Sequence, residues 1–153
     1  MKNYVVIDLE MCTVPERRGL SLKNEIIEIG AVSLDENLRI TDSFKTYVSP
    51  LYGVITNHIK NLTGITYKDT DHAPTLEAAL RMLSEWLPEN AVLVSWSDTD
   101  AAQLRRETAF KGIGSEKIRR FIESTVDCQK IFSEKMDTQK IYRLSEALIL
   151  ADI

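Results

Sequence analysis

The sequence has little cysteine, no long apolar run and no excess of positive charge. Its two cysteines, Cys12 and Cys128, are too few and too far apart for a disulfide framework or a zinc site, so we expect free thiols in a reducing compartment. No apolar run approaches membrane-spanning length, and the amino terminus enters the first expected strand without a signal sequence. These absences predict a cytoplasmic protein that does not contact membranes.

The charge balance lacks the positive excess of a general polyanion binder. The formal net charge is -4 at pH 7, from 19 Lys and Arg against 23 Asp and Glu. A nucleic-acid enzyme whose carboxylates hold metal ions is less acidic once loaded, so nucleic acid is not excluded as a partner. One stretch is basic, and its residues either form solvated helix faces or, as a group, line a phosphate-facing rim. These residues are Arg105, Arg106, Lys111, Lys117, Arg119 and Arg120.

The chain has the length and apolar content of one domain. Its 153 residues are 44% hydrophobic, which is enough to bury a single substantial core. No internal repeat or low-complexity linker divides it. We therefore expect residues 1–153 to form a single domain.

Apolar periodicity predicts three strands followed by helices that alternate with strands. A tight turn at 35–37 makes the first three strands antiparallel, and the longer later connections place the fourth and fifth strands parallel to the first. The expected fold is α/β, a five-stranded mixed sheet flanked by helices. The expected strands are 4–12, 25–34, 38–48, 91–96 and 126–128, and the expected helices are 55–62, 75–87, 98–110, 116–123, from about 129, and 144–150.

Two carboxylates one residue apart end the first strand. Asp8 and Glu10 should project from the same face, where a shared divalent cation would keep both ionised; alternatively they mark where the strand meets solvent. The fourth strand ends in a second acidic pair, Asp98 and Asp100, at the edge where parallel strands place their sites. Because Asp98 is suited to cap the following helix, we prefer Asp100 as the third ligand of a Mg²⁺ or Mn²⁺ site.

Four motifs in order resemble one family over nearly the whole chain. They are Val5-Val6-Ile7-Asp8-Leu9-Glu10, Ile26-Ile27-Glu28-Ile29-Gly30-Ala31-Val32, Leu62-Thr63-Gly64-Ile65-Thr66 and Ser95-Trp96-Ser97-Asp98-Thr99-Asp100 with Leu104. This order resembles the DEDD (DEDDh-type) 3′-5′ exonucleases, and the form of the last motif is similar to the branch of ERI-type exonucleases and KapD-like inhibitors. The resemblance implies an RNase H-like fold.

The resemblance also implies a two-metal hydrolase. Asp8 would contact both Mg²⁺ or Mn²⁺ ions, Glu10 would hold the nucleophile-side ion and Asp100 the second, so that mononucleotides leave the 3′ end of single-stranded DNA or RNA. The backbone at Met11 and Cys12 would hold the terminal nucleotide. Leu62 and Thr63 would also contact it; their alternative roles are apolar packing and helix capping.

The sequence departs from the family pattern near its end. The family carries a general-base His and, five residues later, a fourth carboxylate on a final helix, whereas only five residues follow the segment 144–148 that resembles the stretch before it. His58 and His72 lie upstream of Asp100, in the wrong order for this motif. We therefore expect a C-terminally incomplete domain with impaired turnover, since positioned proton transfer contributes roughly a factor of 10² to 10⁴.

Two other functions remain open for the same fold. One is a non-catalytic binding or regulatory module like the KapD-like inhibitors, with a protein target as its partner. The other is a proofreading subunit that works beside a polymerase. The preference for DNA or RNA and the oligomeric state do not follow from the sequence.

Overall fold

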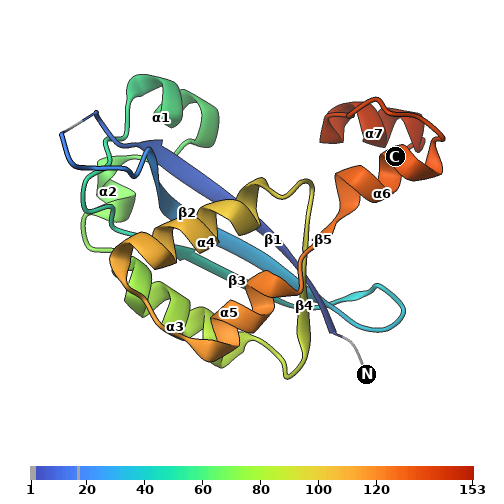
Figure 1. Cartoon of the computed structure of the whole chain (residues 1–153), viewed down its shortest axis with the longest axis horizontal. Helices are drawn as coiled ribbons and strands as arrows, with labels where there is room; N and C mark the ends of the chain where they lie inside the picture. The colour runs from blue at the N-terminus through green and yellow to red at the C-terminus, as the bar shows by residue number, and fades with distance from the viewer. Residues whose placement is uncertain (1–2, 17) are drawn as a thin grey trace.

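The computed structural model describes residues 3–16 and 18–153, and its element order confirms a meander of three strands followed by crossovers (Figure 1). The strands are β1 (Asn3–Thr13), β2 (Asn24–Leu34), β3 (Ile40–Tyr47), β4 (Ala91–Ser95) and β5 (Val126–Asp127). The helices are α1 (Asn57–Thr63), α2 (Tyr67–Thr70), α3 (Leu76–Trp86), α4 (Thr99–Lys111), α5 (Glu116–Glu123), α6 (Cys128–Lys135) and α7 (Leu144–Leu150).

The strands form one mixed sheet in the order β3-β2-β1-β4-β5. β1, β2 and β3 are antiparallel, whereas β4 runs parallel to β1 and β5 parallel to β4. The predicted fold class is therefore confirmed. Because β1 and β4 are parallel neighbours, their carboxyl ends lie at the same edge of the sheet.

One face of the sheet is covered by α3, α4 and α5 (Figure 1). Val5, Ile7 and Leu9 of β1 point into this layer and are at most 5% exposed. The alternation of side chains along a strand then turns Asp8 and Glu10 to the opposite face. The local sequence pattern thus decides which face carries the carboxylates.

A smaller second core lies under α1, made by Cys12, Ile27, Ile55 and Ile65. Helix α1 begins after Thr56, whose side chain accepts the N–H of Ile59, and ends at Gly64 in the left-handed conformation. The sequence pattern did not predict α2, because four residues are too few to show a helical period. A capping box between Thr66 and Asp69 defines this short helix.

The predicted element ends differ from the observed ones by at most two residues, and the difference at the start of β3 has a local cause. The strand expected from residue 38 starts at Ile40, because Leu38 adopts a positive φ of 60°. The carboxylate of Asp35 accepts the N–H groups of Asn37 and Arg39, which lengthens the turn.

Helices α6 and α7 form a separate lobe beyond β5 (Figure 1). Aromatic contacts join the lobe to the end of β4: the Phe132 ring centroid lies 5.8 Å from that of Trp96 and 5.4 Å from that of Tyr142. The indole N–H of Trp96 also donates to the carbonyl of Tyr142 at 3.2 Å. The lobe is therefore held against the carboxylate edge of the sheet.

Within residues 3–16 and 18–153, none of the helices combines the length and the apolar character that crossing a bilayer requires.

Candidate functional site

The two β1 carboxylates lie on the open face of the sheet, beside a break in its regular pairing. Asp8 is paired with Gly30 and Glu10 with Glu28, after which the register shifts between Glu10 and Met11. Such bulges redirect side chains next to active sites. Asp8 is exposed and Glu10 is half-buried.

Asp100 approaches these two side chains from the first turn of α4. Burial, the negative charge of Asp8 and, to a smaller extent, that of Glu10 raise the pKa of Asp100 to about 6, although backbone hydrogen bonding at Leu9 opposes the shift. Burial is the largest cause of this shift, and the like charges of Asp8 and Glu10 add to it. The structure therefore brings together the three carboxylates singled out from the sequence.

The neighbouring Asp98 occupies the N-cap position of α4, but its side chain makes no capping hydrogen bond. The reason for setting Asp98 aside as a capping residue is therefore wrong in its detail. The preference for Asp100 rests instead on its electrostatic coupling to Asp8 and Glu10. Asp100 as a ligand stays a prediction.

The β1 carboxylates have raised pKa values too. Partial desolvation and then the charge of Glu28 raise the pKa of Asp8. Desolvation and the charges of Asp8 and Glu28 raise the pKa of Glu10, and Lys45 partly offsets them. A bound cation would relieve this repulsion between carboxylates.

The donor set fits hard divalent cations, which prefer carboxylate oxygens. In the part of the chain that the structure describes, however, no three His, Cys, Asp or Glu side chains stand in an arrangement that could already hold a metal ion. Asp8, Glu10 and Asp100 are near enough to repel one another, and their side chains would have to turn inward to share an ion.

Two further charged residues belong to this site and were missed as site residues in the sequence. Glu28 lies directly opposite Glu10, and Lys45 of β3 forms an ion pair with Glu28 at 2.9 Å. The available signal was the alternation in the segment 25–34, which places Glu28 on the face opposite Ile29. Lys45 could be found only with the register of the β2–β3 pair.

The predicted nucleotide contacts at Met11 and Cys12 follow the bulge of β1. The Cys12 side chain is 1% exposed, and burial with the nearby Glu25 charge raises the pKa of its thiol to about 12. Met11 packs partly against the main core. Burial therefore leaves only the backbone of Cys12 for a nucleotide contact, and the backbone contacts at Met11 and Cys12 stay predictions.

Leu62 and Thr63 lie at the end of α1. Leu62 is 72% exposed, which excludes apolar packing as its role within this chain. The hydroxyl of Thr63 donates to the carbonyl of Ile59 and accepts the N–H of Ile65, so Thr63 does stabilise the helix end. A nucleotide contact at either residue stays a prediction.

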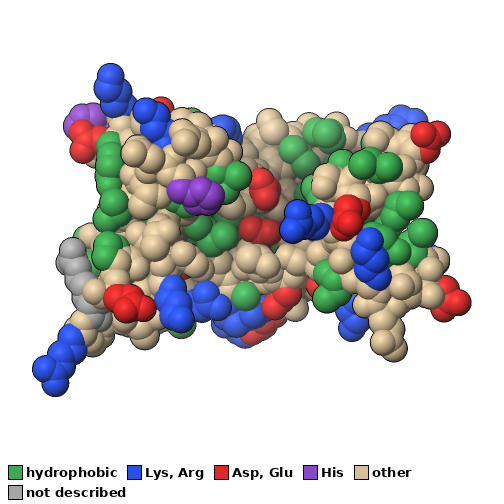
Figure 2. Space-filling model, turned by 90° about the horizontal axis from the view of Figure 1, so that it is seen from above, with side chains coloured by type: hydrophobic (Ala, Val, Ile, Leu, Met, Phe, Trp, Pro, Cys, Tyr) green, Lys and Arg blue, Asp and Glu red, His purple; other side chains and the backbone are tan. Residues whose placement is uncertain are grey.

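The carboxylate edge opens into a hollow between two lobes. Figure 2 shows the hollow from above, with acidic side chains on its floor, and Figure 1 places α1 on one side of it and α6 and α7 on the other. His58 and His72 are both exposed, as expected for surface residues. Asp127 caps α6 by accepting the N–H of Lys130, which is a structural role.

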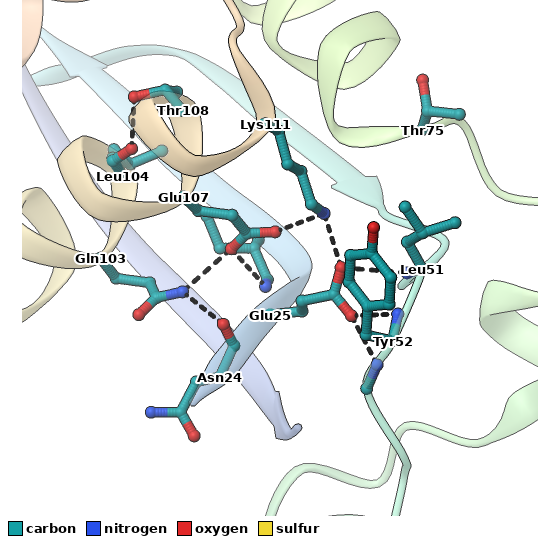
Figure 3. Close-up of polar contacts among 12 residues, drawn as sticks. Asn24, Glu25, Leu51, Tyr52, Thr75, Gln103, Leu104, Glu107, Thr108 and Lys111 are labelled. Atoms are coloured by element: carbon teal, nitrogen blue, oxygen red, sulfur yellow. Dashed lines mark hydrogen bonds and ion pairs between the residues drawn. The ribbon is translucent and has the colours of Figure 1, made fainter. Parts of the chain in front are cut away.

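Helix α4 is anchored to β2 by a buried polar network (Figure 3). Glu107 accepts the N–H of Ile26 and the side-chain amide of Gln103, each at 2.9 Å, and Lys111 at 2.8 Å. Lys111 also pairs with Glu25 at 2.6 Å, and both carboxylates are 0% exposed. These residues share one stripe of α4 with Asp100, so the network sets the rotation of the helix that carries Asp100.

The pKa shifts of Glu25 and Lys111 both favour their charged forms. Burial by itself raises the pKa of Glu25, but hydrogen bonds from Lys111 and from the N–H groups of Leu51 and Tyr52 hold it below its ordinary value. Burial acts to lower the pKa of Lys111, and its two carboxylate partners raise it above the ordinary value. Ion pairing therefore outweighs desolvation in both groups.

The basic stretch does not form the continuous rim considered from the sequence. Lys111 is turned inward to Glu25 and Glu107, and Arg119 and Arg120 both pair with Glu116 on α5. Helix α5 covers the face of the sheet opposite Asp8. These side chains are used for packing and local ion pairs.

The same network holds the loop that leads into α1. Glu25 accepts the N–H groups of Leu51, Tyr52 and Gly53, and Val54 donates to the carbonyl of Thr13 at 2.8 Å. A Cβ atom at position 53 would lie 2.2 Å from the Cys12 sulfur. Only glycine fits at this close approach of the loop to β1.

We expect Gly53→Ala to lower the free energy of unfolding by about 1 to 3 kcal/mol, the range for overpacked cores. The buried Cys12 side chain cannot move aside, so the loop must. Urea denaturation measures the effect. Gly114→Ala is the matched control, because a Cβ there has no atom within 4 Å among the described residues. Removing the Cys12 sulfur with Cys12→Ala should restore most of the loss; no recovery would contradict this origin.

The chain matches the family model described as Exonuclease (RNase_T) over residues 5–149. Among curated relatives, it is 40% identical over 93 residues to a PolC-type DNA polymerase III of Caldanaerobacter subterraneus, covering 60% of this chain and 6% of that protein. It is 34% identical over 106 residues to the DNA polymerase III subunit epsilon of Aquifex aeolicus, covering 69% of this chain and 48% of that subunit. The matches thus span less than half of either relative.

Solved structures with the same fold include a 3′-exonuclease in a structure on the 3′-end specific recognition of a histone mRNA stem-loop. Its TM-score is 0.75 at 21% identity, covering 89% of this chain and 49% of that one. Cell-death related nuclease 4 has a TM-score of 0.74 at 22% identity, covering 93% and 50%. The nuclease domain of 3′hExo, a DEDDh family member bound to rAMP, has a TM-score of 0.64 at 23% identity, covering 92% and 82%.

Proposed function

Because this chain belongs to the exonuclease (RNase_T) family, we propose that it is a metal-dependent 3′-5′ exonuclease that releases mononucleotides from single-stranded DNA or RNA. The observation that carries this proposal is the convergence of Asp8, Glu10 and Asp100 at one edge of the sheet, where burial and then the charges of Asp8 and Glu10 raise the pKa of Asp100. Carboxylates that repel one another in this way are suited to share divalent cations.

In the proposed site, Asp8, Glu10 and Asp100 would hold two Mg²⁺ or Mn²⁺ ions. When bound, the ions supply an activated water and stabilise the charge on the leaving 3′ oxygen. Asp8 and Glu10 come from a central strand of the sheet, and the buried network on α4 holds the helix that carries Asp100, so the ions would require the three side chains to turn but not the backbone to move. The backbone at Met11 and Cys12, with Leu62 and Thr63 of α1, would orient the terminal nucleotide in the hollow.

The test is the release of mononucleotides from single-stranded oligonucleotides by the purified chain. We expect the labelled nucleotide of a 3′-labelled oligonucleotide to be released first, and a 5′-labelled oligonucleotide to be shortened by one nucleotide at a time. Both reactions should require Mg²⁺ or Mn²⁺ and should stop when the metal is chelated. Binding of single strands without any metal-dependent release would refute turnover by this chain. Release that persists under excess chelator would refute the metal-dependent mechanism.

A second candidate function is proofreading beside a DNA polymerase. It is favoured by the similarity of this chain to part of a PolC-type DNA polymerase III and to part of a DNA polymerase III epsilon subunit. Co-purification of the chain with a replicative polymerase would support it. A chain that is active on single strands and does not bind such a polymerase would count against it.

A further inference from the structure

The open face of the sheet next to Asp8 carries Lys45, and the strand register sets the two in one row. Asp8 of β1 lies opposite Gly30 of β2, and Gly30 lies opposite Lys45 of β3. Because Gly30 has no side chain, nothing projects from β2 between Asp8 and the stem of Lys45. Two strand spacings separate their backbones, which is about 10 Å.

Lys45 is held close to the carboxylates yet remains accessible. Its ammonium lies 2.9 Å from Glu28, and its side chain is 62% exposed whereas that of Glu28 is 16% exposed. The hydrogen bond with Glu28 and the charges of Glu28 and Glu10 raise the pKa of Lys45, so it stays cationic. An ammonium has three donors, and one ion pair leaves others for a second anion.

The carboxylates around Lys45 would repel a polyanionic substrate, and a cation at this position opposes that repulsion. Asp8 and Glu28 act on Glu10 as like charges, and Lys45 is the cation whose field opposes them. The next row of the same face is Glu10, Glu28 and Tyr47, and the Tyr47 ring lies 5.4 Å from the Lys45 ammonium. Tyr47 packs against the small core under α1, so Lys45 faces the same side of the site as the predicted nucleotide contacts.

We propose that Lys45 binds a backbone phosphate of the single-stranded substrate, close to the linkage that is cleaved. Glu28 orients the Lys45 ammonium before the nucleic acid binds. This inference rests on the proposed exonuclease function. A lysine acts on phosphate as a point charge, so the contact strengthens binding without reading the base. Lys45 is thus a substrate-binding residue supplied by the edge strand.

The test measures binding of a single-stranded oligonucleotide, protected at its 3′ end by phosphorothioate linkages, in Mg²⁺ at several salt concentrations. We expect Lys45→Met to weaken binding roughly five-fold near 0.1 M salt and to reduce the slope of log K against log salt by about 0.7, the value for one phosphate contact on a single strand. The matched control is Lys117→Met on α5, whose ammonium donates to the carbonyl of Leu87. We expect no change of slope for this variant.

Two further measurements separate a phosphate contact from a general charge effect. A neutral methylphosphonate placed at one linkage at a time should abolish the Lys45→Met effect at one position near the 3′ end, since only contacting groups are coupled in a double-mutant cycle. Glu28→Gln frees the ammonium and should strengthen binding. The inference would be overturned if Lys45→Met altered Mn²⁺ affinity but left the slope of log K against log salt unchanged. It would also be overturned if methylphosphonates at every linkage changed the Lys45→Met effect equally.

These outcomes can be told apart from failure of the proposed function. If the unaltered chain binds or degrades single strands and Lys45→Met has the same slope of log K against log salt, only the inference about Lys45 is refuted. If the unaltered chain neither binds nor degrades any single strand, the proposed function falls and the inference falls with it.

Discussion

Asp100→Asn is expected to reduce metal-dependent nucleotide release roughly 10³-fold or more, whereas Asp98→Asn, two residues earlier in the same turn, is expected to leave it within about three-fold. Metal stabilisation of a transition state contributes several kcal/mol, and each 1.36 kcal/mol is a factor of ten in rate. Asparagine keeps the size of the side chain and removes the charge that a cation needs. The measurement is the initial rate of mononucleotide release under saturating Mg²⁺ or Mn²⁺.

Folding provides the control for this pair. The carboxylate of Asp100 is destabilised by burial and by Asp8, as its raised pKa shows, so Asp100→Asn should leave the free energy of unfolding unchanged or slightly higher when no metal is present. Mn²⁺ binding, followed by the loss of its free-ion EPR signal, should weaken in Asp100→Asn and in Asp8→Asn. Equal loss of activity in the Asp98 and Asp100 variants would contradict the choice of Asp100 as the ligand.

Lys111→Met is expected to lower the free energy of unfolding by about 3 to 5 kcal/mol, because it leaves Glu25 and Glu107 buried without their cation. Both carboxylates are 0% exposed and cannot turn to water. For a chain of this size, such a loss corresponds to a fall in Tm of roughly 6 to 20 °C. Urea and thermal denaturation measure it.

Lys117→Met is the control, because the Lys117 ammonium donates to one neutral carbonyl instead of two buried carboxylates. We expect it to cost no more than about 1.5 kcal/mol, the net value of an ordinary hydrogen bond. Adding Glu107→Gln to Lys111→Met removes one unpaired charge, so the double variant should be less destabilised than the sum of the two single ones. A Lys111→Met chain as stable as the Lys117 variant would contradict a charged, buried network.

Patterns along the chain predicted most of the sheet. Alternation in the first strand placed Asp8 and Glu10 on one face, and the structure confirms this placement. Short elements and turns were less predictable. The four residues of α2 show no period, and the Asp35 side chain delays the start of β3 through hydrogen bonds that no periodicity reveals.

Within the site, the sequence predicted the residues that a local pattern marks. It did not predict the residues that join the site only through the pairing of strands. Asp8 and Glu10 lie on the first strand and Asp100 follows the fourth, so their place near one another could be predicted. Glu28 and Lys45 become site residues only through the register of two strand pairs. Lys111, counted with the basic stretch in the sequence, proved to be the cation of a buried network.

The sequence by itself determined the order and type of the long elements and the face of β1 that bears the carboxylates, because these depend on residues that are neighbours along the chain. Tertiary structure alone decided which charges meet: Glu28 with Glu10, Lys45 with Glu28, and Lys111 with Glu25 and Glu107. Such meetings depend on the bulge after Glu10 and on the rotation of α4. Both are set by packing between segments far apart in the sequence, which no local pattern encodes.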